Sequence, residues 1–132
     1  MATRMLQTIG ETANQIRRCL AVSDEHEALR WVAQFMAEFR RAPLADRPGL
    51  VAGEPSPTGD RRWDAMLAGV VEQLCFDDGL AIPGWVMQPD RFLEQWWFVT
   101  PYRSLHASAF AETPVALANR GVFIHGRSLE SV

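Results

Sequence analysis

The sequence predicts a mainly α-helical domain, and three observations carry this prediction. Apolar side chains recur at steps of three and four over residues 3–21, 24–40 and 60–78, which is the spacing of amphipathic helices. Prolines and glycines concentrate between residues 42 and 59 and again in the last third of the chain, where they interrupt any longer helix. A chain of 132 residues is long enough to bury one core. We therefore expect a compact orthogonal helical domain over residues 1–132, with an N-terminal helical hairpin, a long strap and a short extended C-terminal segment.

The first 41 residues predict a hairpin of two helices joined by a short turn. The first helix, residues 3–21, carries one apolar stripe that consists of Met5, Ile9, Ala13, Ile16 and Leu20. Ser23 or Asp24 can cap the second helix, and Glu27 follows Asp24 at the spacing of a capping box. That helix is expected to run to about Arg40, with an apolar face formed by Leu29, Val32, Phe35, Met36 and Phe39.

Residues 42–59 predict a strap across the surface of the domain, followed by the third helix. Each proline of the strap disfavours helix at the residue before it, so we expect only one short turn, around Leu50 and Val51. Asp60 is a good N-cap for the third helix, and Gly79 suits a left-handed stop at its end. The wide apolar stripe of this helix makes it the expected central helix, and consists of Trp63, Met66, Leu67, Val70, Val71 and Leu74.

Short aromatic-rich helices are expected beyond the third helix. A brief helix is predicted from Gln88 to Trp97, because Pro89 is tolerated in a first helical turn. Another is predicted from Ser104 to Glu112, with the inward side chains Leu105, Ala109 and Phe110.

The last twenty residues predict one more helix and an extended segment. Thr113 and Pro114 form a pair typical of a cap and a first turn, the helix runs over residues 115–120, and Gly121 ends it. Residues 122–124 are expected to be extended, and a turn at Ser128 precedes Leu129.

Composition limits the classes of function. The formal net charge is −3, so the overall field of the protein does not attract nucleic acid. Every basic side chain is arginine, which suits protein interfaces because it forms bidentate pairs with carboxylates and stacks on aromatic rings. Cys19 and Cys75 are too few and too far apart for a disulfide framework or a metal site. We expect buried free thiols.

The expected compartment is the cytoplasm. No run approaches the roughly 20 apolar residues of a membrane span. The first ten residues lack the continuous apolar region of a signal peptide. The sequence therefore predicts a cytoplasmic protein with no membrane association.

No catalytic or cofactor signature is present. His26, His106 and His125 belong to no metal-binding or catalytic spacing, and the glycine patterns of nucleotide sites are absent. We therefore expect no cofactor, no metal and no enzymatic activity. A small enzyme in which His106 acts with Asp90 or Glu94 is the lowest-ranked alternative.

A DNA-associated regulator is the main alternative to a protein-binding role. Arg40 and Arg41 with Arg47, and Arg61 with Arg62, could form a basic rim around the strap, and the regulator would use Arg40, Arg41, Arg61 and Arg62. Nucleic-acid binding also needs a recognition helix or interleaved exposed aromatic rings. The strap is too long for a helix-turn-helix, so nucleic acid is the less favoured partner.

The aromatic C-terminal third carries the main functional prediction. Most of its rings are expected to cover the third helix, and one or two are expected to be exposed beside an arginine. Trp, Tyr and Arg most often carry the binding energy of protein interfaces. The predicted partner-binding residues are Trp85, Trp97, Tyr102, Arg103, Arg120 and Phe123. A homodimer through the first two helices is a further expectation.

Several segments resemble a little-characterised group of actinobacterial proteins. The resemblance covers about residues 48–132 and rests on the segments Arg62–Gly69, Pro83–Val86, Trp97–Phe98, Thr113–Pro114 and Arg120–Ile124. Members of that group often carry an N-terminal helix-turn-helix, and some are antitoxin-like regulators encoded beside nucleotidyltransferase-type toxins. Residues 1–41 depart from the group because they form no convincing DNA-binding module. The resemblance therefore implies a protein that binds and occludes a partner, such as a toxin.

Overall fold

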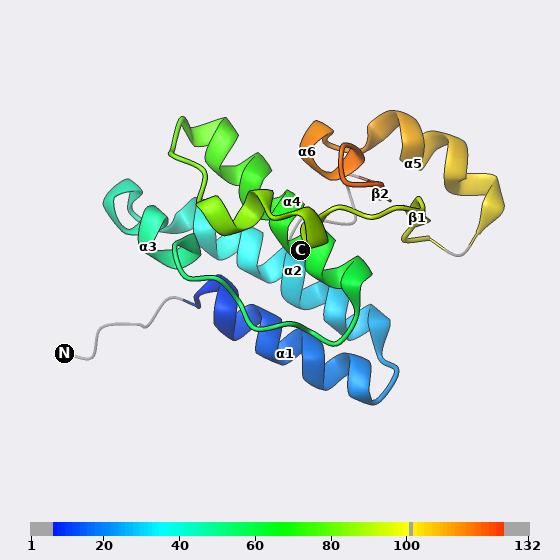
Figure 1. Ribbon diagram of the computed structural model, residues 1–132, viewed down its shortest axis with the longest axis horizontal. Coiled ribbons are helices and arrows are strands. Elements are labelled where there is room, and N and C mark those ends of the chain that lie inside the picture. The colour runs from blue at the N-terminus through cyan, green and yellow to red at the C-terminus, as the bar shows by residue number, and fades with distance from the viewer. Residues whose placement is uncertain (1–6, 101, 126–132) are drawn as a thin grey trace.

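The computed structural model describes residues 7–100 and 102–125 of the chain (Figure 1). These residues are mainly helical, which confirms the predicted fold class. Met5, Ser128 and Leu129, about which the sequence made predictions, lie outside the described residues. Helix α4 lies between the hairpin of α1 and α2 and the C-terminal elements, so it is the central helix, as predicted (Figure 1).

The N-terminal hairpin consists of α1 (Ile9–Ala21) and α2 (Glu25–Arg41). Asp24 caps α2 by accepting a hydrogen bond of 3.0 Å from the N–H of Glu27, as predicted. Ser23 is no cap; it adopts a φ of 58° and closes the turn. The first helix begins later than predicted, because the extended residue Thr8 caps it by accepting from the N–H of Glu11.

The strap is more ordered than the sequence predicts. It contains a 3-10 turn, η1 (Leu44–Asp46), and the short helix α3 (Arg47–Val51), because Pro48 falls in a first turn where no N–H is needed. Arg47 fixes this helix: its guanidinium donates to the carbonyl oxygens of Ala42 and Arg40 and pairs with Asp78 at 2.9 Å. The strap is thereby joined to the ends of both α2 and α4.

Helix α4 (Arg61–Asp78) has the bounds that its caps predict. The Asp60 side chain accepts from the N–H of Arg62, and Gly79 ends the helix at a φ of 68°. A close approach to the C-terminal elements occurs at Gly69, where an added Cβ would lie 2.7 Å from Cδ2 of Leu117.

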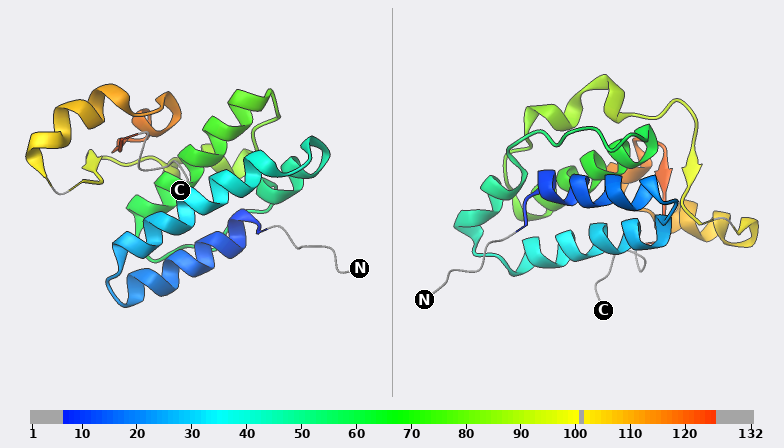
Figure 2. Two further views of the ribbon diagram at one scale, coloured as in Figure 1. Left: turned by 180° about the vertical axis from the view of Figure 1, so that it is seen from behind. Right: turned by 90° about the horizontal axis from the view of Figure 1, so that it is seen from below.

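The C-terminal third holds short helices and two short strands. In order these are η2 (Gly84–Met87), η3 (Pro89–Arg91), β1 (Trp97–Phe98), η4 (Arg103–Leu105), α5 (His106–Glu112), α6 (Val115–Ala118) and β2 (Val122–Phe123). The strands form a parallel pair in which Trp97 is opposite Val122 and Phe98 is opposite Phe123. The prediction that residues 122–124 are extended is confirmed for the two residues of β2. Both views of Figure 2 show α5 projecting from the rest of the molecule.

Three details of this third correct the sequence predictions. The helix predicted up to Trp97 is a single 3-10 turn, because the N–H groups of Leu93 and Trp97 bond to the chain at residues 120–121 instead. Leu105 and Phe110, expected to point inward, are 41% and 52% exposed. Thr113 does not cap α6, because its hydroxyl bonds to the backbone of Ile124, and α6 ends at Ala118, before Arg120.

Candidate functional site

Three of the six predicted partner-binding residues are buried, so the prediction that they contact a partner directly is wrong. Trp85, Arg120 and Phe123 are 7%, 0% and 3% exposed. The indole N–H of Trp85 donates to the carbonyl oxygen of Val51 at 2.9 Å, which joins η2 to the strap. Such a buried donor needs an internal acceptor, and here it has one. These side chains hold the domain together.

Arg120 binds three elements at once. Its guanidinium donates to the carbonyl oxygens of Val86 (2.9 Å) and Arg91 (3.1 Å) and to Oε1 of Glu72 on α4 (2.6 Å). It also lies 4.2 Å from the ring centroid of Phe92. Burial lowers the pKa of Arg120, while the hydrogen bond and charge of Glu72 oppose that shift. The residue therefore serves as a buried cross-link between α4, η2 and η3.

Exposed large side chains gather near the buried ring of Phe123. We call it the aromatic face and define it by four exposed side chains: Trp96, Tyr102, Leu105 and Phe110. The Trp96 and Phe110 rings lie 5.5 Å apart, and both contact the buried ring of Phe123, at 5.0 and 5.1 Å. Helix α5 thus covers Phe123 but leaves the outer sides of its own apolar residues in solvent.

One predicted residue belongs to this face, a second follows it in the chain, and a third packs inward. Tyr102, which is 66% exposed, and Arg103 are both at the surface, as expected. Trp97 is half-buried and packs edge-on against Trp63 at 5.4 Å. The sequence does not single out Trp96, because it cannot show which of two neighbouring tryptophans points outward. The strand that begins at Trp97 directs the ring of Trp97 inward and leaves the ring of Trp96 exposed.

The four arginines of the nucleic-acid alternative do not form one patch. All four are exposed, but Arg62 pairs with Glu25 at the first residue of α2, whereas Arg40 and Arg41 are its last two residues. Helix α2 has 17 residues, so the two pairs lie about 24 Å apart at 1.5 Å per residue. The predicted basic rim is therefore divided between the two ends of a helix.

The side chain of Arg62 already interacts with other residues of the chain. It pairs with Asp60 at 2.8 Å, and its guanidinium lies 5.0 Å from the ring centroid of Trp97. The side-chain hydrogen bond with Asp60 raises the pKa of Arg62, and the same bond lowers the pKa of Asp60. Arg61 and Arg103, by contrast, make no ion pair or side-chain hydrogen bond with any residue that the structure describes.

A chain of hydrogen-bonding side chains joins β2 to α5. Ser108 Oγ lies 3.3 Å from Nε2 of His125, and Nδ1 of His125 lies 2.7 Å from Oε2 of Glu112. The Ser108 hydroxyl is also 3.1 Å from the carbonyl oxygen of Leu105, and its one proton can serve only one of these two acceptors. These contacts fasten the residue that follows Ile124 after β2 to the side chains of α5.

His106 does not form the acid–base pair of the enzyme alternative. Its ring stacks on Phe98 at 4.3 Å, and its Nε2 lies 3.2 Å from the carbonyl oxygen of Thr100. A carbonyl oxygen only accepts, so Nε2 is the donor. His106 thus joins α5 to the end of β1 and is not directed at Asp90 or Glu94.

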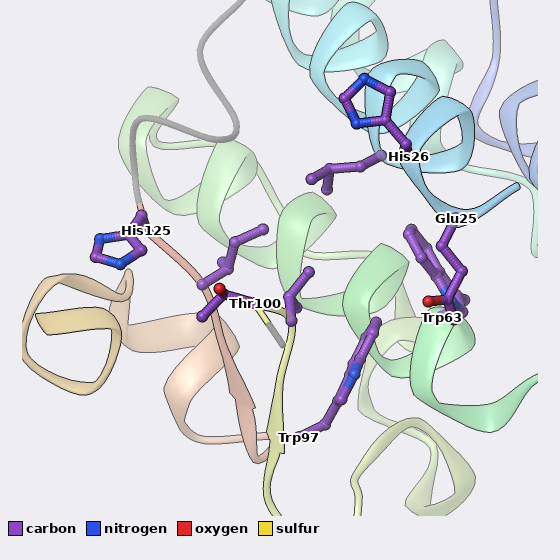
Figure 3. A pocket seen from close by; sticks show the side chains of 9 residues that line it. Glu25, His26, Trp63, Trp97, Thr100 and His125 are labelled. Atoms are coloured by element: carbon purple, nitrogen blue, oxygen red, sulfur yellow. The ribbon is translucent and has the colours of Figure 1, made fainter. Parts of the chain in front are cut away.

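A cavity of about 340 Å³ lies between the start of α2 and the ends of the two strands. Figure 3 shows its labelled residues, which come from α2, α4 and the strand ends: Glu25, His26, Trp63, Trp97, Thr100 and His125. A second hollow of about 450 Å³ borders residues 92–97 together with Arg61 and Arg62. The first hollow is lined by Glu25, His26, Thr100 and His125 beside apolar side chains, and the second by Arg61, Arg62 and Glu94 beside aromatic ones.

The potential metal ligands and the thiols of the described residues are dispersed. Within residues 7–100 and 102–125, no group of three or more His, Cys, Asp and Glu side chains could hold a metal ion. Cys19 and Cys75 are free, and burial raises the pKa of both thiols. Cys75 is buried, as predicted, whereas Cys19 is half-buried.

Comparison with known proteins adds no relative. No family model matches the chain, and no curated protein or solved structure matches it. In the part of the chain that the structure describes, no helix combines the length and the apolar character needed to cross a membrane.

Proposed function

We propose that this protein is a non-enzymatic interaction module that binds a protein partner through its aromatic face. The observation that carries the proposal is the exposure of Tyr102, Leu105 and Phe110 on α5 and the turn before it, together with Trp96, whose ring packs against Phe110 at 5.5 Å and is 64% exposed. Grouped exposed apolar side chains mark protein-binding surfaces more often than isolated ones do.

The binding mechanism follows from the chemistry of these side chains. Trp and Tyr bring a large apolar area and few rotatable bonds, so they act as anchors when a partner pocket receives them. Arg103 is exposed beside Tyr102 and has no described ion-pair partner, so it is available for a carboxylate of the partner. An antitoxin-like protein would use such a surface to occlude a toxin.

The first test identifies the partner. Affinity purification from the native host would compare the wild-type protein with Phe110→Ser and with the matched control Phe76→Ser. Phe76 is 74% exposed, but it lies on α4 outside the aromatic face. We expect one partner to bind the wild type and the control and to be lost with Phe110→Ser.

The second test addresses occlusion. The purified partner would be titrated calorimetrically with the same three proteins, and its toxicity would be scored by growth with and without co-expression of this chain. Loss of a central aromatic anchor should weaken binding by at least about 30-fold, which corresponds to the 2 kcal/mol of an interface hot spot. A partner that binds Phe110→Ser as tightly as the wild type would overturn the proposal, as would the absence of any specific partner.

A further inference from the structure

The two-stranded sheet has an open edge at β1. Its hydrogen-bonded order is β1–β2, so within the described residues β1 has a neighbour on one side only. The N–H groups of Trp97 and Val99 bond to the carbonyl oxygens of Gly121 and Phe123. Because successive residues of a strand point their N–H and C=O groups to opposite edges, those of Phe98 face away from β2. This edge is a template for a further strand.

Among the described residues, one base and one acid without an ion pair line the hollow next to the segment that leads into β1. The hollow of about 450 Å³ borders residues 92–97, the segment that leads into β1, and both Arg61 and Glu94 line it. Both side chains are exposed, and neither makes an ion pair or side-chain hydrogen bond with a described residue. The charge of Arg62 is already offset by Asp60 at 2.8 Å. Arg61 and Glu94 are therefore the charges of this hollow that are open to a partner.

We infer that this edge binds a second copy of the chain, with β1 paired to its counterpart about a two-fold axis. In such an interface each surface meets itself, so a residue i that contacts j on the partner implies that j contacts i. A surface that offers one arginine and one glutamate is complementary to itself: Arg61 of each copy pairs with Glu94 of the other. A uniformly acidic partner would instead repel Glu94, and a uniformly basic one would repel Arg61.

The N-terminal hairpin offers less for self-association, although the sequence suggested it. Among its described residues, Val22 is the one large hydrophobic side chain that is exposed. The outer surface of α1 is polar, with Glu11, Asn14, Arg17 and Arg18 exposed. The dimer is thus assigned to the β1 edge, where both backbone groups and complementary charges are available.

Sedimentation equilibrium and light scattering over a concentration series test this assignment. We expect a reversible dimer whose association weakens with added salt, because the charge pairs are exposed. Arg61→Glu and Glu94→Arg should each weaken dimerisation by about tenfold or more, since each places like charges across the axis twice. The double variant Arg61→Glu/Glu94→Arg should restore the wild-type association constant to within about threefold. Arg103→Glu, which reverses an exposed charge elsewhere, is the matched control.

Amide hydrogen exchange gives a second readout that a change in folding alone would not mimic. The N–H of Phe98 should exchange more slowly as the protein concentration rises, and this dependence should vanish in Arg61→Glu. A monomer at all concentrations would overturn the inference, and so would a dimer that both single reversals leave intact or that the double variant fails to restore. Arg61→Glu and Glu94→Arg leave Arg103 and the four side chains of the aromatic face in place, so affinity purification with Phe110→Ser tests partner binding separately from dimerisation.

Discussion

Replacement of Arg120 by methionine separates a buried cross-link from a partner contact. The variant keeps a linear apolar stem against Phe92 but removes the donors to the Val86 and Arg91 carbonyl oxygens and to Glu72. Breaking one side of a buried charge pair costs about 3–5 kcal/mol. The lower end applies here, because the Glu72 side chain is 23% exposed and can turn toward water. We therefore expect a loss of about 3 kcal/mol in the free energy of unfolding.

Urea unfolding followed by tryptophan fluorescence measures this loss. With a slope of about 1–3 kcal/mol per molar urea, the midpoint should fall by roughly 1–3 M. Arg103→Met removes an exposed arginine and should change the free energy of unfolding by less than about 0.5 kcal/mol. In a double-mutant cycle, Glu72→Gln should couple to Arg120→Met by about 1 kcal/mol or more. A midpoint for Arg120→Met equal to that of Arg103→Met would refute the buried cross-link and indicate that Arg120 lies at the surface.

Three further predictions concern other contacts. Gly69→Ala should destabilise the protein by about 1–2 kcal/mol in the same urea assay, because the new Cβ would lie 2.7 Å from Cδ2 of Leu117. Gly49→Ala in α3 is the control: its Cβ meets nothing within 4 Å, so it should be neutral or stabilising. Asp60→Ala should lower the free energy of unfolding by about 1 kcal/mol above pH 5 through loss of the helix cap. Because Arg62 lowers the pKa of Asp60, the difference between the variant and the wild type should shrink as the pH falls below about 4 and through that lowered pKa. A difference that does not depend on pH would contradict the role of Asp60 as a charged cap. Cys75 should resist a thiol reagent at pH 8 in the folded protein and react in urea, since burial raises its pKa and hides the sulfur, and the variant Cys19→Ala isolates its signal.

The long helices could be predicted because their signals are local. An apolar stripe and a cap lie within one stretch of chain, so Asp24, Asp60 and Gly79 marked real helix ends. The start of the first helix was placed too early, because Thr8 supplies a cap that the stripe alone does not reveal. The helix over Arg47–Val51 was missed because prolines read as breaks, although a proline is compatible with a first turn.

The candidate site was harder to predict because its geometry depends on distant segments. Arg120 looks like a surface residue until its acceptors, some 29 to 48 residues away, are brought around it. Trp96 and Trp97 are neighbours in sequence, and only the pairing of β1 with β2 determines that one is exposed and the other packs on Trp63. Exposure of a particular ring is a property of the assembled fold, whereas the excess of rings is visible in the sequence.

Arg47 has a consequence for how the folded protein opens locally. One guanidinium bonds to the backbone at the end of α2 and to Asp78 in the last turn of α4. A local opening that lifts the strap must break these bonds together, so it also frees the last turn of α4 from its ion pair. Amides in these two places should then lose protection as one cooperative unit, although 31 residues separate Arg47 from Asp78 along the chain.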